Sequence, residues 1–335
     1  MKQRNIKSSI LFTVLILFQI TACKDQDDQD EPTGWRQIPG FEKQRVEVIH
    51  VLGSSIYVGG RDSIYVSTDN AKSWKTIVTG LPIPDYSYWL RSFGSLLVND
   101  TTYLFAGTVL DGIYRSTDNG KSWQEANNGI GNGIEGYFVR ALGSCDGVVY
   151  ATVQVDMSIR LYYSTNRGQW WSVITNAPTE DFYGYACIGN RIFLATNWNG
   201  VVSTSDKGQS WTSTWNYETN TSDVGLFETQ INAITTNGKD VFAVGDYSIH
   251  YSTDGGNYWN RISPDSIAPP GEIIAVMKDS TVMVGYFVSH NYGRTWSEEI
   301  EGLPLPSRIQ TSAILGDKIY IGLNDGLWVN PSILK

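Results

Sequence analysis

The stretch Ser116-Thr117-Asp118-Asn119-Gly120-Lys121-Ser122-Trp123 decides the fold of this chain, because its pattern recurs along most of the sequence. The short Asp side chain can accept hydrogen bonds from backbone N–H groups of its own turn, and Gly supplies the positive φ that closes the turn. A β-rich run, Gly112-Ile113-Tyr114, precedes the stretch, and Trp123 begins the strand that follows. The stretch is therefore predicted to be a hairpin turn whose Trp packs between neighbouring sheets.

Five further copies vary the same motif. They are Ser67, Asp69, Ser73 and Trp74; Ser164, Asn166, Gly168 and Trp171; Thr204, Asp206, Gly208, Ser210 and Trp211; Ser252, Asp254, Gly256 and Trp259; and Ser289, Asn291, Gly293, Thr295 and Trp296. Successive motif Trp residues are 37 to 49 residues apart, which is the spacing of four-stranded propeller blades. A catalytic role would not be duplicated at every repeat, so these Asp and Trp residues are predicted to be structural.

A second signature, predicted to be one inner strand of each blade, recurs ahead of the motif. Its seven copies are Ile56–Gly59, Leu104–Gly107, Val149–Thr152, Ile192–Ala195, Val241–Val244, Val282–Gly285 and Ile319–Gly322. The seventh unit ends after Gly326-Leu327-Trp328-Val329 without a Trp-bearing outer strand, whereas Gly34-Trp35-Arg36-Gln37 resembles such a strand and has no blade before it. We therefore expect an all-β, seven-bladed β-propeller whose N-terminal strand completes the last blade and closes the ring.

The motif resembles the Asp-box, or BNR, repeat of sialidase-like β-propellers, and the resemblance covers nearly the whole mature chain. The compact blades, nearly all of which carry the motif, are most similar to those of xyloglucanase, sortilin-type and photosystem II assembly-factor propellers. This resemblance implies that the motif turns lie on one face of the ring. It also implies that functional sites lie on the opposite face, where loops enter the innermost strands.

The first 22 residues resemble a bacterial lipoprotein signal peptide. Three positive charges precede an apolar run from Ile10 to Ile20, which is too short for a membrane-spanning helix and ends in small residues. The tetrad Ile20-Thr21-Ala22-Cys23 resembles a lipobox, so Cys23 is expected to carry lipid; cleavage into a soluble secreted protein is the alternative. The predicted organisation is a signal peptide at 1–22, an acidic tether at 23–33 and the propeller at 34–335.

The acidic segment Lys24–Glu31 resembles the export signal of surface lipoproteins in Bacteroidota. We therefore expect an outer-membrane lipoprotein of a Gram-negative bacterium, displayed on the cell surface as a monomer and held to the membrane by lipid alone. Removing residues 1–22 takes away three positive charges and changes the formal net charge from −9 to −12. A strongly acidic chain disfavours nucleic acid as a partner.

Cysteine and histidine usage gives little sign of catalysis or metal binding. After lipidation of Cys23 only Cys145 and Cys187 remain, and a disulfide between them suits an oxidising compartment, although the sequence leaves the pairing open. The three His residues lie in different blades without ligand spacing, so neither a metal site nor a Ser-His-Asp system is predicted. No cofactor is expected.

Candidate ligand-binding residues lie near the start of the innermost strands. Aligned on His50, Ser92, Ala141, Ala186, Ala233, Ala275 and Ala313, these strands carry polar and aromatic residues one and three positions upstream. Rings interleaved with amides and carboxylates suit sugars, and Arg favours an acidic glycan. The alternative is that these groups satisfy one another around a water-filled channel. The predicted ligand-binding set is Glu47, Trp89, Arg91, Phe138, Arg140, Tyr183, Tyr185, Trp198 and Glu272.

The sequence favours a cell-envelope propeller that binds a glycan or a protein ligand on this face without catalysis of its own. Two alternatives remain, a glycoside hydrolase and a scaffold or assembly factor for an envelope complex. A sialidase would need an Arg cluster beside a Tyr–Glu pair. The candidates are Arg91, Arg140 and Arg308, with Tyr183 or Tyr185 beside Glu47 or Glu272. The Arg-Ile-Pro signature of sialidases is absent, and no catalytic residue is assigned.

Overall fold

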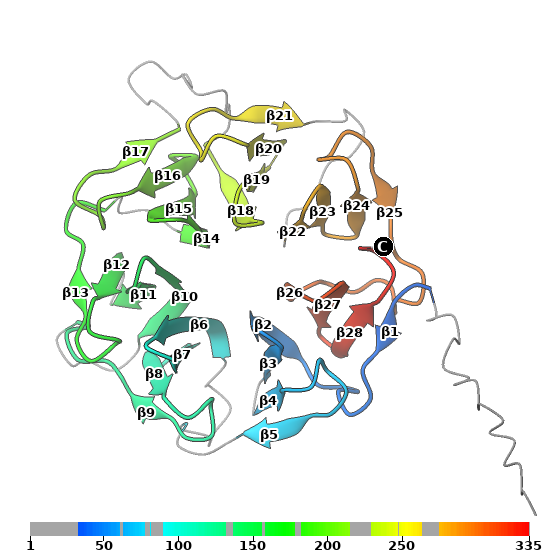
Figure 1. Cartoon of the computed structure of the whole chain (residues 1–335), viewed down its shortest axis with the longest axis horizontal. Helices are drawn as coiled ribbons and strands as arrows, with labels where there is room; N and C mark the ends of the chain where they lie inside the picture. The colour runs from blue at the N-terminus through cyan, green and yellow to red at the C-terminus, as the bar shows by residue number, and fades with distance from the viewer. Residues whose placement is uncertain are drawn as a thin grey trace, which may run out of the picture. The chain divides into compact units, whose positions relative to one another are not determined.

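The computed structural model describes residues 33–60, 63–77, 81, 90–131, 137–155, 158–177, 182–214, 229–246, 248–262 and 275–334. These residues form seven four-stranded antiparallel sheets arranged in a ring, and none of them lies in a helix (Figure 1). The predicted fold class, an all-β seven-bladed propeller, is confirmed. Within the described residues, no helix is long and apolar enough to cross a membrane.

Blades are numbered in chain order, and the first strand of each lies nearest the centre of the ring. Blades 1 to 4 are β2 (Val46–Leu52), β3 (Ser55–Gly60), β4 (Ile64–Ser67), β5 (Lys75–Ile77); β6 (Leu90–Val98), β7 (Thr101–Thr108), β8 (Ile113–Ser116), β9 (Gln124–Glu125); β10 (Phe138–Cys145), β11 (Val148–Val155), β12 (Ser158–Ser164), β13 (Ser172–Val173); and β14 (Phe182–Ile188), β15 (Arg191–Thr196), β16 (Val201–Thr204), β17 (Thr212–Ser213). Blades 5 to 7 are β18 (Ile231–Thr236), β19 (Val241–Gly245), β20 (Ile249–Ser252), β21 (Asn260–Ile262); β22 (Ala275–Lys278), β23 (Thr281–Val284), β24 (Phe287–Ser289), β25 (Ser297–Glu298); and β26 (Thr311–Leu315), β27 (Lys318–Leu323), β28 (Gly326–Asn330) with β1 (Arg36–Gln37).

The N-terminal strand closes the ring, as predicted. β1 pairs antiparallel with β28, with Arg36 opposite Val329 and Gln37 opposite Trp328; in Figure 1 the blue β1 lies beside the red β28. Trp35 is 5 % exposed, and both its backbone N–H and its indole Nε1 donate hydrogen bonds of 2.8 Å to carbonyls just after β25. The first strand thus covers an edge of β28 that would otherwise be open to association.

One apolar pairing repeats in the seven core clusters between neighbouring blades. The second residue of the inner-strand signature in one blade shares a core cluster with the motif Trp of the next. The pairs are Tyr57 with Trp123, Phe105 with Trp171, Tyr150 with Trp211, Phe193 with Trp259, Phe242 with Trp296, Met283 with Trp35 and Tyr320 with Trp74. The predicted packing of these Trp residues between sheets is confirmed, and Trp35 takes the same role at the closing interface.

The motif forms the predicted hairpin turn between the third and fourth strands of a blade. In blade 2 the Asp118 carboxylate accepts hydrogen bonds from Ser116 Oγ (2.7 Å), from the Ser122 backbone N–H (2.9 Å) and from Ser122 Oγ (2.6 Å). Gly120 has a φ of 84° and donates its N–H to Ser116 Oγ at 2.8 Å. The side chains therefore bond the turn from within, and the left-handed position favours Gly, although blade 1 has Ala71 there with a φ of 64°.

Replacing Asp118 with Ala should lower the free energy of unfolding by about 1 kcal/mol, because the turn loses its internal acceptor. Asp118→Asn should stay within about 0.5 kcal/mol of the parent. Blade 6 already uses Asn291 at this position, where its Oδ1 accepts from the Thr295 N–H (2.9 Å) and its Nδ2 donates to Thr295 Oγ1 (2.8 Å). Chemical denaturation of both variants checks this, and equal losses would contradict the acceptor role.

Candidate functional site

A β-bulge near the start of the innermost strand adds one extra residue to the strand in five successive blades. In blade 1, Val46 pairs with Gly60 and Val48 pairs with Gly59, so Glu47 is the extra residue. The bulged residues are Glu47, Arg91, Arg140, Tyr183 and Asn232. A bulge redirects a side chain and is common beside functional sites. Because adjacent strands are antiparallel, these bulges lie at the end of each blade opposite the motif turn.

The bulges correct the strand alignment made from the sequence. In that alignment, Glu47 was the equivalent of Trp89 and Phe138. In the observed register, Glu47 is the bulged residue of its strand and is therefore the equivalent of Arg91 and Arg140. The error arises because residues two apart lie on the same face of a strand, so periodicity alone cannot choose between them. The residues used to align the strands are themselves not equivalent. His50 lies opposite Tyr57, the second residue of the inner-strand signature, whereas Ser92 lies opposite Gly107, the fourth, and Ala275 lies opposite Val284, the third.

Glu47 holds two Arg side chains at this end of the ring. Its side chain is 1 % exposed, and its carboxylate oxygens form ion pairs with Arg45 Nε and with Arg91 Nη1, the latter at 3.5 Å. Both Arg side chains are 39 % exposed. A buried carboxylate needs such partners. Glu47 is therefore occupied in orienting Arg91, and each Arg side chain is still partly open to solvent.

Phe138 joins Arg91 to Arg140 in the next blade. The Cζ atoms of Arg91 and Arg140 lie 5.6 Å and 5.3 Å from the centre of the Phe138 ring, within the range of cation–π attraction. Arg140 Nη2 also donates to Gln154 Oε1 at 2.9 Å. We call the residues Arg45, Glu47, Arg91, Phe138 and Arg140 the mouth cluster. With three Arg and one Glu, it carries a positive charge on an acidic chain.

The aromatic candidates of blade 4 lie at two depths. Tyr183 is a bulged residue and is 45 % exposed, and Trp198, in the turn between β15 and β16 at the same end of the blade, is 57 % exposed. Tyr185 is mostly buried, and its ring packs so closely on Gly143 of blade 3 that a Cβ there would collide with it. Burial raises the pKa of the Tyr185 hydroxyl. Tyr185 therefore packs between blades 3 and 4, while Tyr183 and Trp198 are exposed at this end of blade 4.

Blades 5 and 7 differ from blades 1 to 4, because their amide side chains at this end form hydrogen bonds with polar side chains of the same blade. Asn232 Nδ2 donates to Asp246 Oδ1 (2.7 Å), and Gln230 Nε2 donates to Asn232 Oδ1 (3.2 Å). In blade 7, Gln310 Nε2 donates to Asn324 Oδ1 at 3.2 Å. The predicted site residues Trp89 and Glu272, and the lipidation residue Cys23, lie outside the described residues. The candidate site is therefore assigned to blades 1 to 4.

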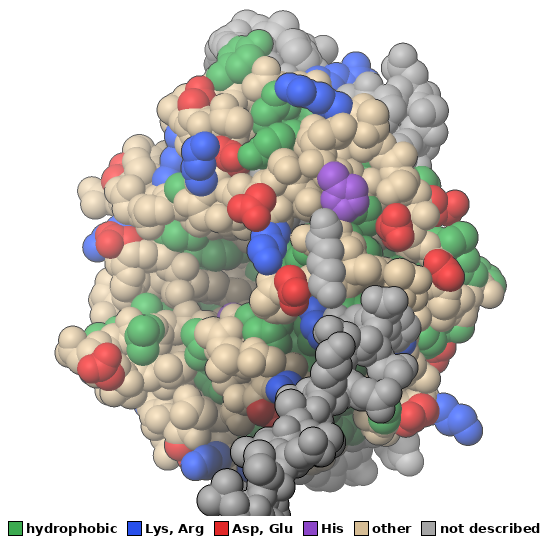
Figure 2. Space-filling view, turned by 45° about the vertical axis from the view of Figure 1, so that its right-hand side comes forward, with side chains coloured by type: hydrophobic (Ala, Val, Ile, Leu, Met, Phe, Trp, Pro, Cys, Tyr) green, Lys and Arg blue, Asp and Glu red, His purple; other side chains and the backbone are tan. Residues whose placement is uncertain are grey.

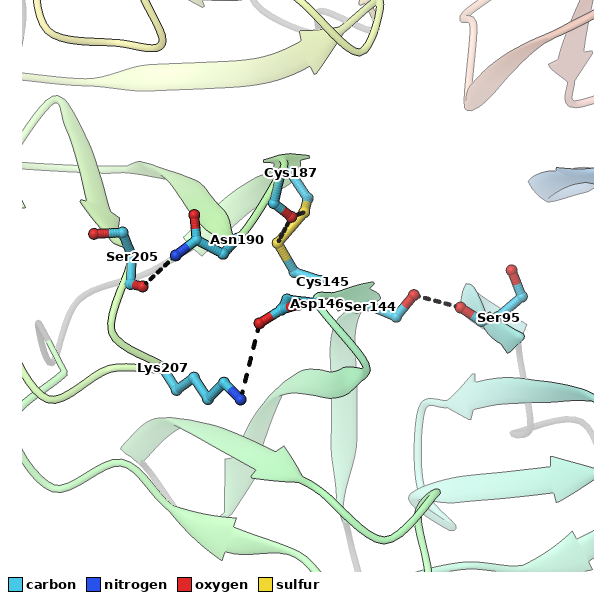
Figure 3. The surroundings of a disulfide bond; sticks show 9 residues. Ser95, Ser144, Cys145, Asp146, Cys187, Asn190, Ser205 and Lys207 are labelled. Carbon is cyan, nitrogen blue, oxygen red and sulfur yellow. Dashed lines mark hydrogen bonds and ion pairs between the residues drawn. A yellow bond between two sulfur atoms is a disulfide. The ribbon is translucent and has the colours of Figure 1, made fainter. Parts of the chain in front are cut away.

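At the opposite end, side-chain contacts link the innermost strands of the same four blades. His50 Nε2 lies 2.9 Å from Ser95 Oγ, and Ser144 Oγ donates to the Ser95 carbonyl at 2.5 Å. A disulfide joins Cys145 to Cys187, with their Cα atoms 5.9 Å apart (Figure 3). The sequence left this pairing open. These contacts fix blades 1 to 4 relative to one another and so preorganise the residues of the mouth cluster.

On the face shown in Figure 2, Lys and Arg side chains are interspersed with Asp and Glu side chains. In the part of the chain that the structure describes, no group of three or more His, Cys, Asp or Glu could hold a metal ion. The mouth cluster is thus a local concentration of Arg that the overall charge does not indicate.

Fold and site together define a seven-bladed β-propeller with a cationic and aromatic mouth. No family model matches the chain, and no curated protein matches it. Similar solved structures include YCF48 bound to D1 peptide (TM-score 0.65, 13 % identity, 90 % of this chain and 97 % of that chain). They also include a GH74 enzyme from Niastella koreensis (TM-score 0.63, 17 % identity, covering 88 % of this chain and 44 % of that chain). A third is an extracellular domain from B. thetaiotaomicron, described as belonging to a hybrid two component system (TM-score 0.66, 15 % identity, 90 % and 42 %). Identities this low show the shared fold alone.

Proposed function

We propose that this chain is an exported, lipid-anchored Asp-box propeller that binds a carboxylate-bearing ligand at the mouth cluster without catalysing a reaction. The ligand is an acidic glycan or an acidic segment of an envelope protein. The observation that carries the proposal is the placement of Arg91 and Arg140 against one ring, Phe138. Guanidinium groups form strong paired hydrogen bonds to carboxylates, and the adjacent ring offers an apolar face for stacking.

The contacts of Glu47 argue against a hydrolase at this site. A sialidase-like mechanism needs a Glu paired with a nucleophilic Tyr. Glu47 instead forms ion pairs with Arg45 and Arg91, whereas Tyr183 and Tyr185 belong to blade 4, three blades further round the ring. The carboxylate of Glu47 therefore supports a binding arrangement.

A scaffold or assembly function is the second candidate, with a protein segment as the ligand. YCF48, a propeller of the same fold, is bound to a peptide in its solved structure. A peptide with acidic side chains or a terminal carboxylate would satisfy the same guanidinium groups as an acidic sugar. Both ligands therefore share one chemistry and are distinguished by experiment.

The proposed address is the outer membrane, through lipid on Cys23. The Cys145–Cys187 disulfide supports export, since disulfides persist in oxidising compartments. In fractionated cells, the parent should be found with the outer membrane and Cys23→Ser should appear in the soluble fraction. A Cys23→Ser variant that stays with the membrane would contradict lipid anchoring.

Titration calorimetry with oligogalacturonate and with a glutamate-rich peptide tests the mouth cluster. We expect at least one of these acidic probes to bind, and Arg140→Gln to weaken binding roughly ten- to hundredfold, because a hydrogen bond to a charged group contributes about 1.5–3 kcal/mol. Preference for the sugar or the peptide decides the ligand class.

Arg36→Gln is the matched control, because Arg36 is an exposed Arg on the outermost strand of blade 7. It should bind the acidic probes like the parent. Binding of neither probe, or equal affinities in Arg140→Gln and the parent, would rule out the proposed site.

A further inference from the structure

Two motif turns carry an exposed aromatic ring where the other turns carry a hydroxyl. In three blades a Ser at this position donates to the second carboxylate oxygen of the motif Asp, at 2.5 Å from Ser73, 2.6 Å from Ser122 and 2.5 Å from Ser210. Blade 3 has Trp170 there and blade 5 has Tyr258, which are 59 % and 55 % exposed. Residues that depart from the local structural pattern are most often at functional positions, so folding alone does not explain these two exposed rings.

Trp170 is not needed for the core of the ring. Its neighbour Trp171 is the motif Trp of blade 3, is fully buried, and donates its indole N–H to the Ala126 carbonyl at 2.7 Å. Trp170 lies instead against Gly129, where an added Cβ would be 3.0 Å from the indole Nε1. Because Gly129 has no side chain, the indole rests on the backbone with more than half of its surface exposed.

The ring of Trp170 lines a pocket of about 480 Å³ between the outer strands of blade 2 and the motif turn of blade 3. The other polar lining comes from Asp111, Tyr114, Glu125, Asn127, Asn128 and Tyr137. Asn127 is fixed by three hydrogen bonds, in which its Nδ2 donates to Asp111 O (2.8 Å) and Glu125 Oε1 (3.0 Å), and its Oδ1 accepts from the Ile113 N–H (2.7 Å). The Tyr137 hydroxyl is buried, and no described group forms a hydrogen bond with it. The pocket is thus built from oriented groups.

We propose that this Trp170 pocket binds a neutral saccharide. The lining includes two carboxylates, Asp111 and Glu125, and no Lys or Arg, so an anionic ligand would be repelled. Sugar hydroxyls can donate to carboxylates, while the apolar face of a pyranose stacks on an exposed indole. The volume falls within the range of small-ligand sites. This site is separate from the mouth cluster and opposite to it in charge, so it extends the proposed function and does not depend on it.

Affinity electrophoresis of the mature chain in gels containing xyloglucan, galactomannan or mixed-linkage β-glucan tests the pocket. We expect at least one of these neutral polysaccharides to retard the parent. Trp170→Ser should weaken that binding at least tenfold, because it removes the stacking surface. This variant restores the residue that the motif carries in blades 1, 2 and 4, so its fold should be retained.

Tyr258→Ser is the matched control, since it makes the same kind of change at the equivalent position of blade 5, away from the pocket lining. It should bind neutral polysaccharide like the parent, and so should Arg140→Gln, which alters the mouth cluster only. Retardation by none of the three polysaccharides, or equal retardation of Trp170→Ser and the parent, would overturn the proposal. Loss in Arg140→Gln but not in Trp170→Ser would move the saccharide site to the mouth and also overturn it.

Discussion

Replacing Trp35 with Ala should lower the free energy of unfolding by about 3–5 kcal/mol, the usual cost of removing a large buried aromatic side chain. Trp35 fills the closing interface of the ring, where it shares a core cluster with Met283 and Trp328. Its indole N–H also bonds the Glu299 carbonyl at 2.8 Å. The loss should lie toward the upper end of this range, because it loosens the strand that covers β28 and exposes an unpaired edge.

Trp198→Ala is the control for this prediction, since the same chemical change is made at a side chain that is 57 % exposed. It should change the stability by no more than about 0.5 kcal/mol. Guanidinium denaturation followed by circular dichroism compares the two variants. If Trp35→Ala were as stable as Trp198→Ala, the N-terminal strand would not be what closes the ring.

Reducing the Cys145–Cys187 disulfide should destabilise the protein by about 4 kcal/mol. The bond closes a loop with a sequence separation of 42 residues, and the chain-entropy relation gives this value for a loop of that size. The effect should spread beyond the bond, because it links blades 3 and 4 at the end opposite the mouth cluster. We therefore expect reduction to weaken the binding of acidic ligand as well.

The double variant Cys145→Ser/Cys187→Ser separates the bond from the reductant. The parent should lose stability on adding dithiothreitol, whereas the double variant should already have the lower stability and should not respond. Thiol titration of the unfolded parent should detect these two cysteines only after reduction. A parent whose stability is indifferent to reductant would contradict the linked arrangement of blades 3 and 4.

The sequence predicted the fold closely because the determining interactions repeat. Each motif turn is held by its own hydrogen bonds, and each motif Trp shares a core cluster with the same signature position of the preceding blade. The six imperfect copies of the motif therefore all indicate the same local structure. The closing strand was predictable for the same reason, since Trp35 stood outside any blade and the last blade lacked its Trp. Repetition makes such contacts visible in one sequence.

The candidate site was predicted less fully, because it depends on features that do not repeat. Arg91, Phe138 and Arg140 were identified. The bulges that make Glu47 and Arg91 equivalent positions could not be predicted, because the two-residue periodicity of a strand does not show where an extra residue is inserted. Arg45 and Gln154 were missed, since only the folded register brings them to the cluster. Trp170 did carry a signal, namely a ring at the Ser position of the motif, which is informative only when that Ser is known to form a hydrogen bond.

The two ends of blades 1 to 4 have complementary roles. At the motif end, His50, Ser95 and Ser144 and the disulfide hold the innermost strands together, and burial lowers the pKa of His50 to about 4, which keeps it neutral near pH 7. At the other end, the bulged residues point away from the regular ladder and carry the charged and aromatic groups. Rigid blades with a redirected residue each suit a binding site that is formed before the ligand arrives.

A crystal structure of the mature chain soaked with the acidic probe that binds most tightly tests the central claim most directly. The account predicts a carboxylate within hydrogen-bond distance of the Arg91 or Arg140 guanidinium, beside the ring of Phe138. A carboxylate bound elsewhere, with neither guanidinium group in contact with it, would contradict it.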